Sequence, residues 1–204
     1  MSSSPFLHFA IGADMSPRIM QALCPQAKLV GAARIDGFKL GFFDHSKVWD
    51  GGELAPIPTP NGVLWGVLYD VCAAELDRLD MAADVREDGS GSRFRYPVTA
   101  IDKAGVKHDA LIYRKDQTAK AQPPSSELMA ILIREAEAHQ FPAAYVAALR
   151  AIESRPASFR VPAAVMPKGR LAACEACSPA AASAGKTAED TGPGSASLAG
   201  PARR

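Results

Sequence analysis

The stretch FAIGADMSPR, residues 9–18, decides how this chain begins to fold, because an apolar run ends there in a glycine and a helix starts. Residues 6–11 are mostly apolar, as in a β-strand, while Ser16 suits a helix N-cap and Pro17 the first helical position. A turn of this kind points backbone N–H groups at one spot, where a carboxylate or another anion can bind. The pattern predicts an anion cradle at Gly12, with a plain strand-to-helix connection as the alternative.

The composition predicts one sizeable core and no nucleic-acid partner. Of the 204 residues, 48% are hydrophobic and 22% are charged, which is an ordinary globular mixture. The 23 basic and 22 acidic residues give a net charge of +1, too small to attract nucleic acid or an anionic membrane. The N-terminal residues lack the features of a signal peptide, and no apolar run approaches the roughly eighteen residues of a membrane span. We therefore expect a cytoplasmic protein without membrane contact.

The cysteines and histidines predict reduced thiols and no metal site. Cys24 and Cys72 are isolated, and the single CxxC at Cys174 and Cys177 lacks the second ligand pair of a zinc site. The histidines are scattered without metal-binding spacing, and we expect none of them to be a ligand or a catalytic group. They are His8, His45, His108 and His139.

Two pairs of apolar segments are predicted to form β-hairpins. Residues 27–35 and 38–43 are separated by Asp36-Gly37, a step that favours a tight hairpin turn. Residues 94–101 and 106–113 alternate around a short turn with a glycine and form the second pair. The sequence thus favours local antiparallel pairing.

The segment between these pairs begins with residues that disfavour a central strand and continues with a clear strand pattern. Residues 56–60 contain three prolines, so we expect an edge strand or a loop there. Asn61-Gly62 then introduces residues 63–69, which have the length and apolar character of a buried strand. Gly66 lies inside this strand and predicts that backbone or ligand approaches closely.

The remaining helices complete an α+β domain, for which a curved mixed sheet or a small β-barrel with flanking helices is expected. Residues 73–81 form a short helix, and two further helices follow the cap candidate Ser125 and the first-turn residue Pro142. We place this domain at residues 1–155. Residues 156–204 are rich in Ala, Pro, Gly and Ser, which predicts a disordered tail.

The order of these segments resembles the gamma-glutamylcyclotransferase-like family, also called the AIG2-like family, over residues 6–153. Each similar piece is short, and together they follow the family's order. They are the loop at residues 11–15, CPQAKLVGAARIDGFKLGFF at 24–43, GVLWGVLY at 62–69, LDRLD at 76–80, PPS at 123–125 and FPAAY at 141–145. The resemblance implies a small-molecule amide substrate and a reaction that needs no metal or cofactor.

The resemblance also implies the site residues. The family's substrate loop corresponds here to Ile11, Gly12, Ala13, Asp14 and Met15. In place of the family's Tyr-Gly-Ser-Asn, this loop keeps the glycine and changes the side chains around it. The family's catalytic glutamate corresponds to Asp80, which is followed by Met81 where the family usually has glycine.

Two of these positions leave alternatives open. If Asp14 points into a pocket, its carboxylate favours a cationic or neutral group over a substrate carboxylate; if it caps the helix at Ser16, it is structural. For the proton-transferring carboxylate, we rank Asp80 first because the resemblance places it there. Further candidates follow in the sequence: Asp84, Glu87 and Glu127.

Three functions are compatible with these residues. The resemblance implies an enzyme in which the amine of a γ-glutamyl group attacks its own amide carbonyl, releasing an amine and 5-oxoproline. A divergent amide hydrolase on the same scaffold is the second possibility. A small-molecule-binding module without catalysis is the third. The sequence does not indicate an oligomeric state.

Overall fold

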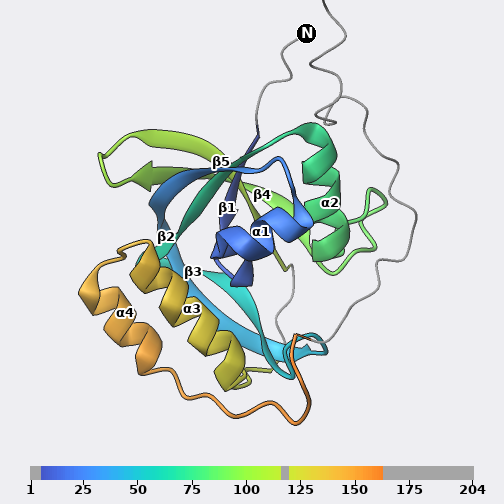
Figure 1. Cartoon of the computed structure of the whole chain (residues 1–204), viewed down its shortest axis with the longest axis vertical. Coiled ribbons are helices and arrows are strands. Elements are labelled where there is room, and N and C mark those ends of the chain that lie inside the picture. Colours follow the sequence, from blue (N-terminus) through green and yellow to red (C-terminus); the bar gives the residue numbers. More distant parts are fainter. Residues whose placement is uncertain (1–5, 116–119, 163–204) are drawn as a thin grey trace, which may run out of the picture. The chain divides into compact units, whose positions relative to one another are not determined.

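In a computed structural model, which describes residues 6–115 and 120–162, five strands close into a barrel in the order β1-β3-β2-β4-β5 (Figure 1). β1 closes the ring by a parallel bridge to β5 at His8 and Leu111, and the other strand pairs are antiparallel. The predicted α+β fold with a small barrel and flanking helices is confirmed. The strands are β1 Phe6–Ala10, β2 Lys28–Ser46, β3 Gly51–Val71, β4 Phe94–Asp102 and β5 Lys107–Arg114.

The opening stretch folds as a strand, a tight turn and a helix. After β1, the one-turn helix η1 (Ala13–Met15) leads into α1 (Pro17–Leu23), with Pro17 in the first turn as predicted. The N–H of Cys24 donates to the carbonyl of Met20 and closes the last turn of α1. The loop at Gly12 therefore lies between a barrel strand and a helix.

The hairpin predicted at Asp36-Gly37 is wrong, because β2 runs through these residues as one strand. The pairing with β3 shifts register between Asp36 and Phe38, and Gly37 has a φ of 82°. Glycine adopts this left-handed conformation at little cost, so the step forms a β-bulge that bends the strand. The chain reverses later, where Ser46 pairs with Gly51.

The proline-rich segment is part of β3, and its position at the edge is confirmed. Pro56 and Pro58 pair with β2 opposite Leu40 and Phe38, whereas β1 pairs with β3 only from Val67 onward. Because the prolines occupy alternate positions, their nitrogens lie on one side of the strand and the intervening residues can pair on the other.

The barrel has an apolar interior and an apolar outer face under the helices. Phe9 and Ala10 are both fully buried but belong to separate core clusters, since successive strand residues point to opposite faces. Phe9 packs in the interior with residues from all the other strands, while Ala10 packs beneath the helices. The remaining α-helices are α2 Ala73–Ala83, α3 Ser126–Ala138 and α4 Ala143–Arg150.

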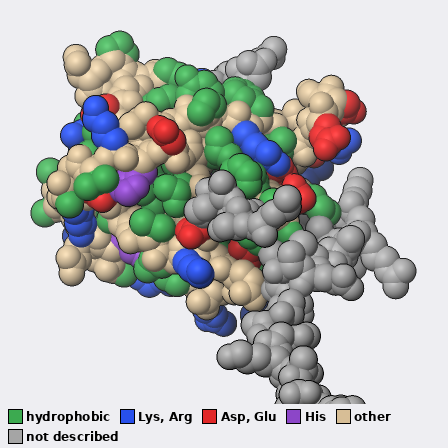
Figure 2. All heavy atoms as spheres, turned by 90° about the horizontal axis from the view of Figure 1, so that it is seen from above, with side chains coloured by type: hydrophobic (Ala, Val, Ile, Leu, Met, Phe, Trp, Pro, Cys, Tyr) green, Lys and Arg blue, Asp and Glu red, His purple; other side chains and the backbone are tan. Residues whose placement is uncertain are grey.

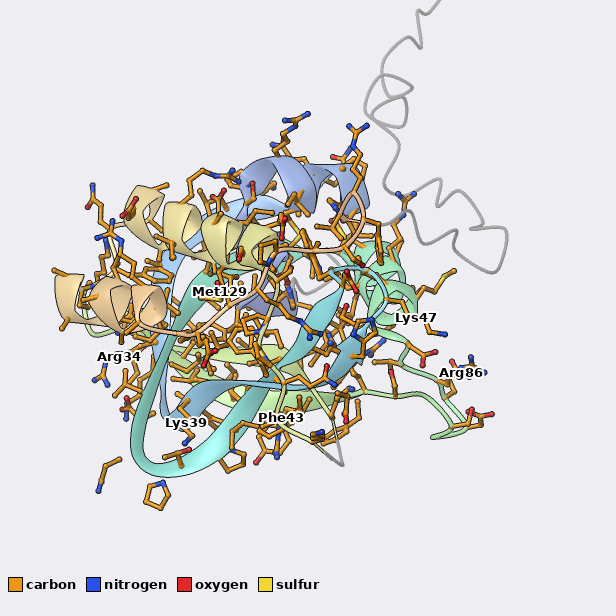
Figure 3. The ribbon with its side chains drawn as sticks, turned by 90° about the horizontal axis from the view of Figure 1, so that it is seen from below. Arg34, Lys39, Phe43, Lys47, Arg86 and Met129 are labelled. Atoms are coloured by element: carbon orange, nitrogen blue, oxygen red, sulfur yellow. The ribbon has the colours of Figure 1, made fainter. Side chains whose placement is uncertain are left out.

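The helices cover different parts of the barrel. α3 and α4 lie side by side, and α2 follows β3 at the other side of α1 (Figure 1). Met129 is buried on the side of α3 toward the strands, while Arg86 lies in the loop after α2, away from the barrel (Figure 3). The side chain of Ser125 accepts a hydrogen bond from the N–H of Leu128 at 3.3 Å, as predicted for a cap of α3.

The surface carries both signs of charge, with acidic and basic side chains interspersed on the face in Figure 2. Within residues 6–115 and 120–162, no helix has the length and apolarity to cross a membrane.

Part of the predicted tail lies within the described residues. Ser158 donates its N–H and hydroxyl to Oδ2 of Asp50, each at 2.6 Å. Residues 163–204, with the CxxC at Cys174 and Cys177, lie outside the described residues, so the predicted disorder is not tested there.

Candidate active site

A cavity of about 320 Å³ opens beside the loop that leaves β1. One wall comes from the end of β1 and the residues after it, and the opposite walls come from the β2–β3 turn, the end of α2 and β5. Segments that are far apart in the sequence thus meet at the Gly12 loop. The volume of the cavity is within the range of about 300–1,000 Å³ that small-molecule sites occupy.

The predicted substrate loop forms part of this cavity, except for its last side chain. Ile11, Gly12, Ala13 and Asp14 line the cavity, whereas Met15 is 2% exposed and packs in the core.

The backbone carbonyl of Met15 anchors the loop to the rest of the protein. It accepts a hydrogen bond from the hydroxyl of Tyr69 at 2.9 Å and another from Nε2 of His139 at 3.1 Å. Because a carbonyl only accepts, the Nε2 atom of His139 carries the proton. The loop is therefore fixed to the barrel through β3 and to the end of α3.

Asp14 lies in the cavity wall and does not cap α1. Its Oδ1 accepts the N–H of Gly12 at 2.9 Å, and its Oδ2 lies 2.8 Å from Nε2 of His8. Ser16 holds the N-cap position of α1 without a side-chain hydrogen bond. The carboxylate of Asp14 thus takes the N–H that we expected to bind a ligand anion.

Asp14 is held in its ionised form. Burial raises the pKa of its carboxyl group, but the hydrogen bond and charge of His8 and the N–H groups of Gly12 and Asp14 outweigh burial. The resulting pKa is below the ordinary value of 3.8. Since an ionised carboxylate only accepts hydrogen bonds, Nε2 of His8 donates and Nδ1 keeps its lone pair when the ring is neutral.

His8 is a site residue that sequence reasoning missed. It lines the cavity, its side chain is 2% exposed, and its ring lies 5.5 Å from that of Tyr113. Within the described residues, Nδ1 of His8 is buried without a hydrogen-bond partner. A pair six residues apart has no recognisable spacing, because the strand end and the η1 turn bring the two side chains together.

The carboxylate of Asp80 lies behind the cavity wall. It forms an ion pair with Arg95, whose Nε donates to Oδ1 at 2.9 Å, and it accepts the hydroxyl of Tyr113 at 2.7 Å. Tyr113 lines the cavity and Asp80 does not. Burial and the bond to Asp80 raise the pKa of the Tyr113 hydroxyl, which therefore keeps its proton and donates it to the carboxylate.

Of the other candidate carboxylates, one lines the cavity and two do not. Asp84 lines the cavity as the left-handed C-cap residue of α2, where its Oδ2 accepts the N–H of Ser92 at 3.1 Å. Glu87 is exposed, and Glu127 accepts the N–H of Ala157 at 3.1 Å, so neither lies in the cavity wall.

Glu53 and Arg93 also line the cavity and were not found from the sequence. Oε1 of Glu53 lies 2.5 Å from the guanidinium of Arg93, and Lys115 pairs with the same carboxylate. These residues come from β3 and from the loop before β4, whose meeting depends on closure of the barrel. No local pattern could have shown it.

The residues described by the structure contain no group of three or more His, Cys, Asp or Glu side chains that could hold a metal ion.

The model of the AIG2-like family matches residues 63–149, which run from β3 through α4. A protein named gamma-glutamylcyclotransferase from Homo sapiens is 28% identical over 152 residues, covering 72% of this chain and 79% of the relative. Residues 63–149 of this chain are thus similar to the AIG2-like family. A Bos taurus protein of the same name is 26% identical over the same shares of both chains.

Solved structures extend the likeness to the barrel and its helices. A structure named gamma-glutamyl cyclotransferase has a TM-score of 0.71 and 26% identity, covering 78% of this chain and 94% of the other. An uncharacterized Homo sapiens protein, loc79017, has a TM-score of 0.70 and 25% identity, covering 77% and 93%. The likeness to proteins named gamma-glutamyl cyclotransferase therefore holds for both sequence and fold.

Proposed function

We propose that this chain is a gamma-glutamylcyclotransferase-like enzyme that cleaves a small amide in the cavity beside residues 11–15. The amine of a γ-glutamyl group, or of a related amino amide, attacks the amide carbonyl of the same molecule. An amine leaves and a five-membered lactam, 5-oxoproline for a γ-glutamyl substrate, remains. The match to the AIG2-like family model over residues 63–149 and the relatives named gamma-glutamylcyclotransferase support this function.

The observation that carries the proposal is the position of the cavity. It lies at the loop that the family resemblance implies as the substrate cradle, and Gly12 and Ala13 are part of its wall. The two donors on the Met15 carbonyl fix this loop before a ligand binds. A rigid wall of this kind can hold a flexible amide in the folded conformation in which its amine meets its carbonyl.

Proton transfer is the second requirement. Two protons must leave the attacking ammonium nitrogen, and two must reach the departing nitrogen, so the reaction consumes no net proton. We assign this transfer to Asp80 acting through Tyr113, since the Tyr113 hydroxyl joins the cavity to the Asp80 carboxylate over 2.7 Å. In this relay the phenol takes a proton from the substrate while passing its own to Asp80, and the transfer reverses toward the leaving nitrogen.

The test is incubation of the full chain with γ-glutamyl amines, γ-glutamyl amino acids, 4-aminobutyryl amides and unrelated amides. Free amine and the lactam product are measured together, for the wild type and for Asp80→Asn. We expect equal amounts of amine and lactam, and a loss of at least about a hundredfold in the variant, because proton transfer contributes about this much. Asp102→Asn, which alters a carboxylate outside the cavity wall, is the matched control.

Other outcomes separate the alternatives. Amine released without lactam would make the protein an amide hydrolase, with water as the nucleophile. Ligand binding without turnover would make it a binding module. Turnover that Asp80→Asn leaves unchanged would remove Asp80 from the reaction while keeping the cyclotransferase activity.

A further inference from the structure

The anion position of the Gly12 loop is already filled by the chain's own carboxylate. Oδ1 of Asp14 accepts the N–H of Gly12 at 2.9 Å, and His8 donates to Oδ2 from behind. A ligand carboxylate at this point would have to displace Asp14 from two donors. It would also approach a fixed negative charge, since the pKa of Asp14 is lowered.

The Asp14 carboxylate can still bind a ligand. Its side chain is 28% exposed and lines the cavity, whereas His8 behind it is 2% exposed. Oδ1 accepts the N–H of Gly12 and Oδ2 accepts from His8, and an ionised carboxylate has about four lone-pair sites, so it can accept from a ligand as well. Nδ1 of His8, which also lines the cavity, is buried without a partner and can accept a hydrogen bond when the ring is neutral. The exposed part of the Asp14 carboxylate therefore favours a ligand group that donates hydrogen bonds.

The charges of the whole wall point the same way. Three carboxylates, those of Asp14, Glu53 and Asp84, line the cavity with one guanidinium, that of Arg93. Arg93 is already paired with Glu53 at 2.5 Å and offers no free charge to a ligand carboxylate. Lys115 also pairs with Glu53, and Arg86 pairs with Asp84, so Asp14 is the carboxylate of the described cavity wall that has no lysine or arginine partner.

The other titratable groups near Asp14 do not reverse this balance. Tyr69 and Cys24 are close enough for the charge of Asp14 to raise the pKa of each, and burial raises both further, so they stay neutral. Tyr113, whose ring lies beside that of His8, also keeps its proton, because burial and its hydrogen bond to Asp80 raise the pKa of its hydroxyl. Within the described residues, the ion-pair partner of Asp14 is therefore His8, which carries a charge only when its ring is protonated.

We infer that the ligand group against Asp14 is a primary ammonium without a neighbouring carboxylate. The substrate class is then a 4-aminobutyryl amide rather than a γ-glutamyl amide. This inference rests on the proposed function, because it narrows the substrate of the same cavity. The amine of such a substrate closes on its own carbonyl, the bond from that carbonyl to the leaving nitrogen breaks, and pyrrolidin-2-one and a free amine form. The two protons lost by the ammonium end on the leaving amine.

The test measures binding by calorimetry with four ligands that differ in one charge at a time. They are an N-alkyl 4-aminobutyramide, its N-acetyl derivative, the matching γ-glutamyl amide and the matching glutaramate, which has the carboxylate without the ammonium. We expect the 4-aminobutyramide to bind most tightly, about tenfold or more above the acetyl derivative, as a charge-assisted hydrogen bond predicts. Asp14→Asn is expected to remove that preference and to improve binding of the glutaramate.

The matched control is Asp102→Asn. Asp102 forms a comparable pair with His108 at 3.0 Å, outside the cavity wall, so this variant should bind all four ligands as the wild type does. A far-ultraviolet circular dichroism melt identifies an Asp14→Asn protein that fails to fold; Asp14→Glu, which keeps the charge and moves it, then serves as the second variant. It should weaken 4-aminobutyramide binding while keeping the order of ligands.

Binding keeps this inference separate from the proposed function. An ammonium preference that depends on Asp14, without turnover of any ligand, would support the inference and reject the cyclotransferase activity. Tighter binding of the γ-glutamyl amide or the glutaramate, or a preference that Asp14→Asn leaves unchanged, would overturn the inference even if turnover is observed. Failure of all four ligands to bind would overturn it as well.

Discussion

The Nε2 atom of His8 lies 2.8 Å from Oδ2 of Asp14, at the point where β1 ends and the cavity begins. The histidine is almost fully buried, while the carboxylate keeps part of its surface toward the cavity. His8 therefore orients Asp14 from the protein side. The pair links the stability of the strand-to-helix turn to the charge that a ligand would meet.

Replacing His8 with phenylalanine should destabilise the fold more than the same change at a surface pair. His8→Phe removes the donor to a charged, partly buried carboxylate, and we expect a loss of about 1.5–3 kcal/mol in the free energy of unfolding. The control is His108→Phe, because His108 forms the same kind of pair with Asp102 but is 23% exposed, against 2% for His8. A loss there of about 0–1 kcal/mol is expected. Equal losses in the free energy of unfolding for the two variants, measured with urea, would show that the His8–Asp14 pair stabilises the fold no more than the His108–Asp102 pair.

The ionisation of Asp14 should appear in the pH dependence of stability. The pKa of this carboxyl group is below its ordinary value of 3.8, so its charge contributes stability that is fully present above pH 3.8. The contribution is lost as the pH falls through the lower pKa of the folded state. Urea unfolding of the wild type and Asp14→Asn at a series of acidic pH values should give a difference that shrinks with decreasing pH. A difference independent of pH would contradict this assignment.

Much of the fold could be predicted because its signals are local. The strand, glycine and cap pattern at residues 6–17 identified β1, the loop and α1. The Asp36-Gly37 step was misread because the same glycine conformation serves a hairpin turn and a bulge. Only the pairing of the whole of β2 with β3 distinguishes the two, and that pairing is set by residues far from the glycine.

The site was harder to predict than the fold. The loop could be located because its residues are consecutive, and its resemblance to a known loop directed attention to Asp14. Glu53, Arg93 and Tyr113 enter the same cavity from three different parts of the chain, and closure of the barrel decides which of their neighbours they meet. Asp80 was ranked by resemblance alone, which could not show that Tyr113 stands between its carboxylate and the cavity.

Removing the Tyr113 hydroxyl tests the proposed relay. Tyr113→Phe keeps the ring in place but disconnects Asp80 from the cavity, so turnover should fall by at least about a hundredfold, as in Asp80→Asn. Stability should fall by only about 1 kcal/mol, because Arg95 still pairs with Asp80. Tyr96→Phe is the control, since Tyr96 packs against Phe38 and Phe94 and does not line the cavity. A fully active Tyr113→Phe protein would exclude the relay.

The thiol of Cys24 should react only when the protein unfolds. Burial raises its pKa to about 12, with the charge of Glu75 as the next cause, so the folded state holds almost no thiolate near neutral pH. The measurement uses a variant in which Cys72, Cys174 and Cys177 are changed to serine, labelled with iodoacetamide across a urea gradient. Labelling should follow the unfolding curve measured by circular dichroism. Fast labelling without urea would contradict the burial of this side chain.

Gly66 of β3 lies against β1, as the sequence predicted from a glycine inside this strand. A Cβ atom added there would lie 2.5 Å from the carbonyl oxygen of Ala10 and 2.7 Å from the ring of Phe9. The carbonyl oxygen of Ala10 belongs to the backbone of β1, just before the Gly12 loop. It can make room for the added Cβ only if the strand moves. Gly66→Ala should therefore destabilise the fold by about 1–3 kcal/mol.

The comparison variant for Gly66→Ala is Gly89→Ala. An added Cβ there meets nothing within 4 Å, and the φ of 73° restricts the cost to backbone strain. That strain amounts to about 1–2 kcal/mol. Gly89 does not line the cavity. The discriminating measurement is therefore ligand affinity: Gly66→Ala should weaken binding of the 4-aminobutyramide because the displaced β1 carries His8 and the loop with it. Unchanged affinity in Gly66→Ala would mean that the loop is positioned by the Met15 carbonyl contacts without help from the β1–β3 pairing.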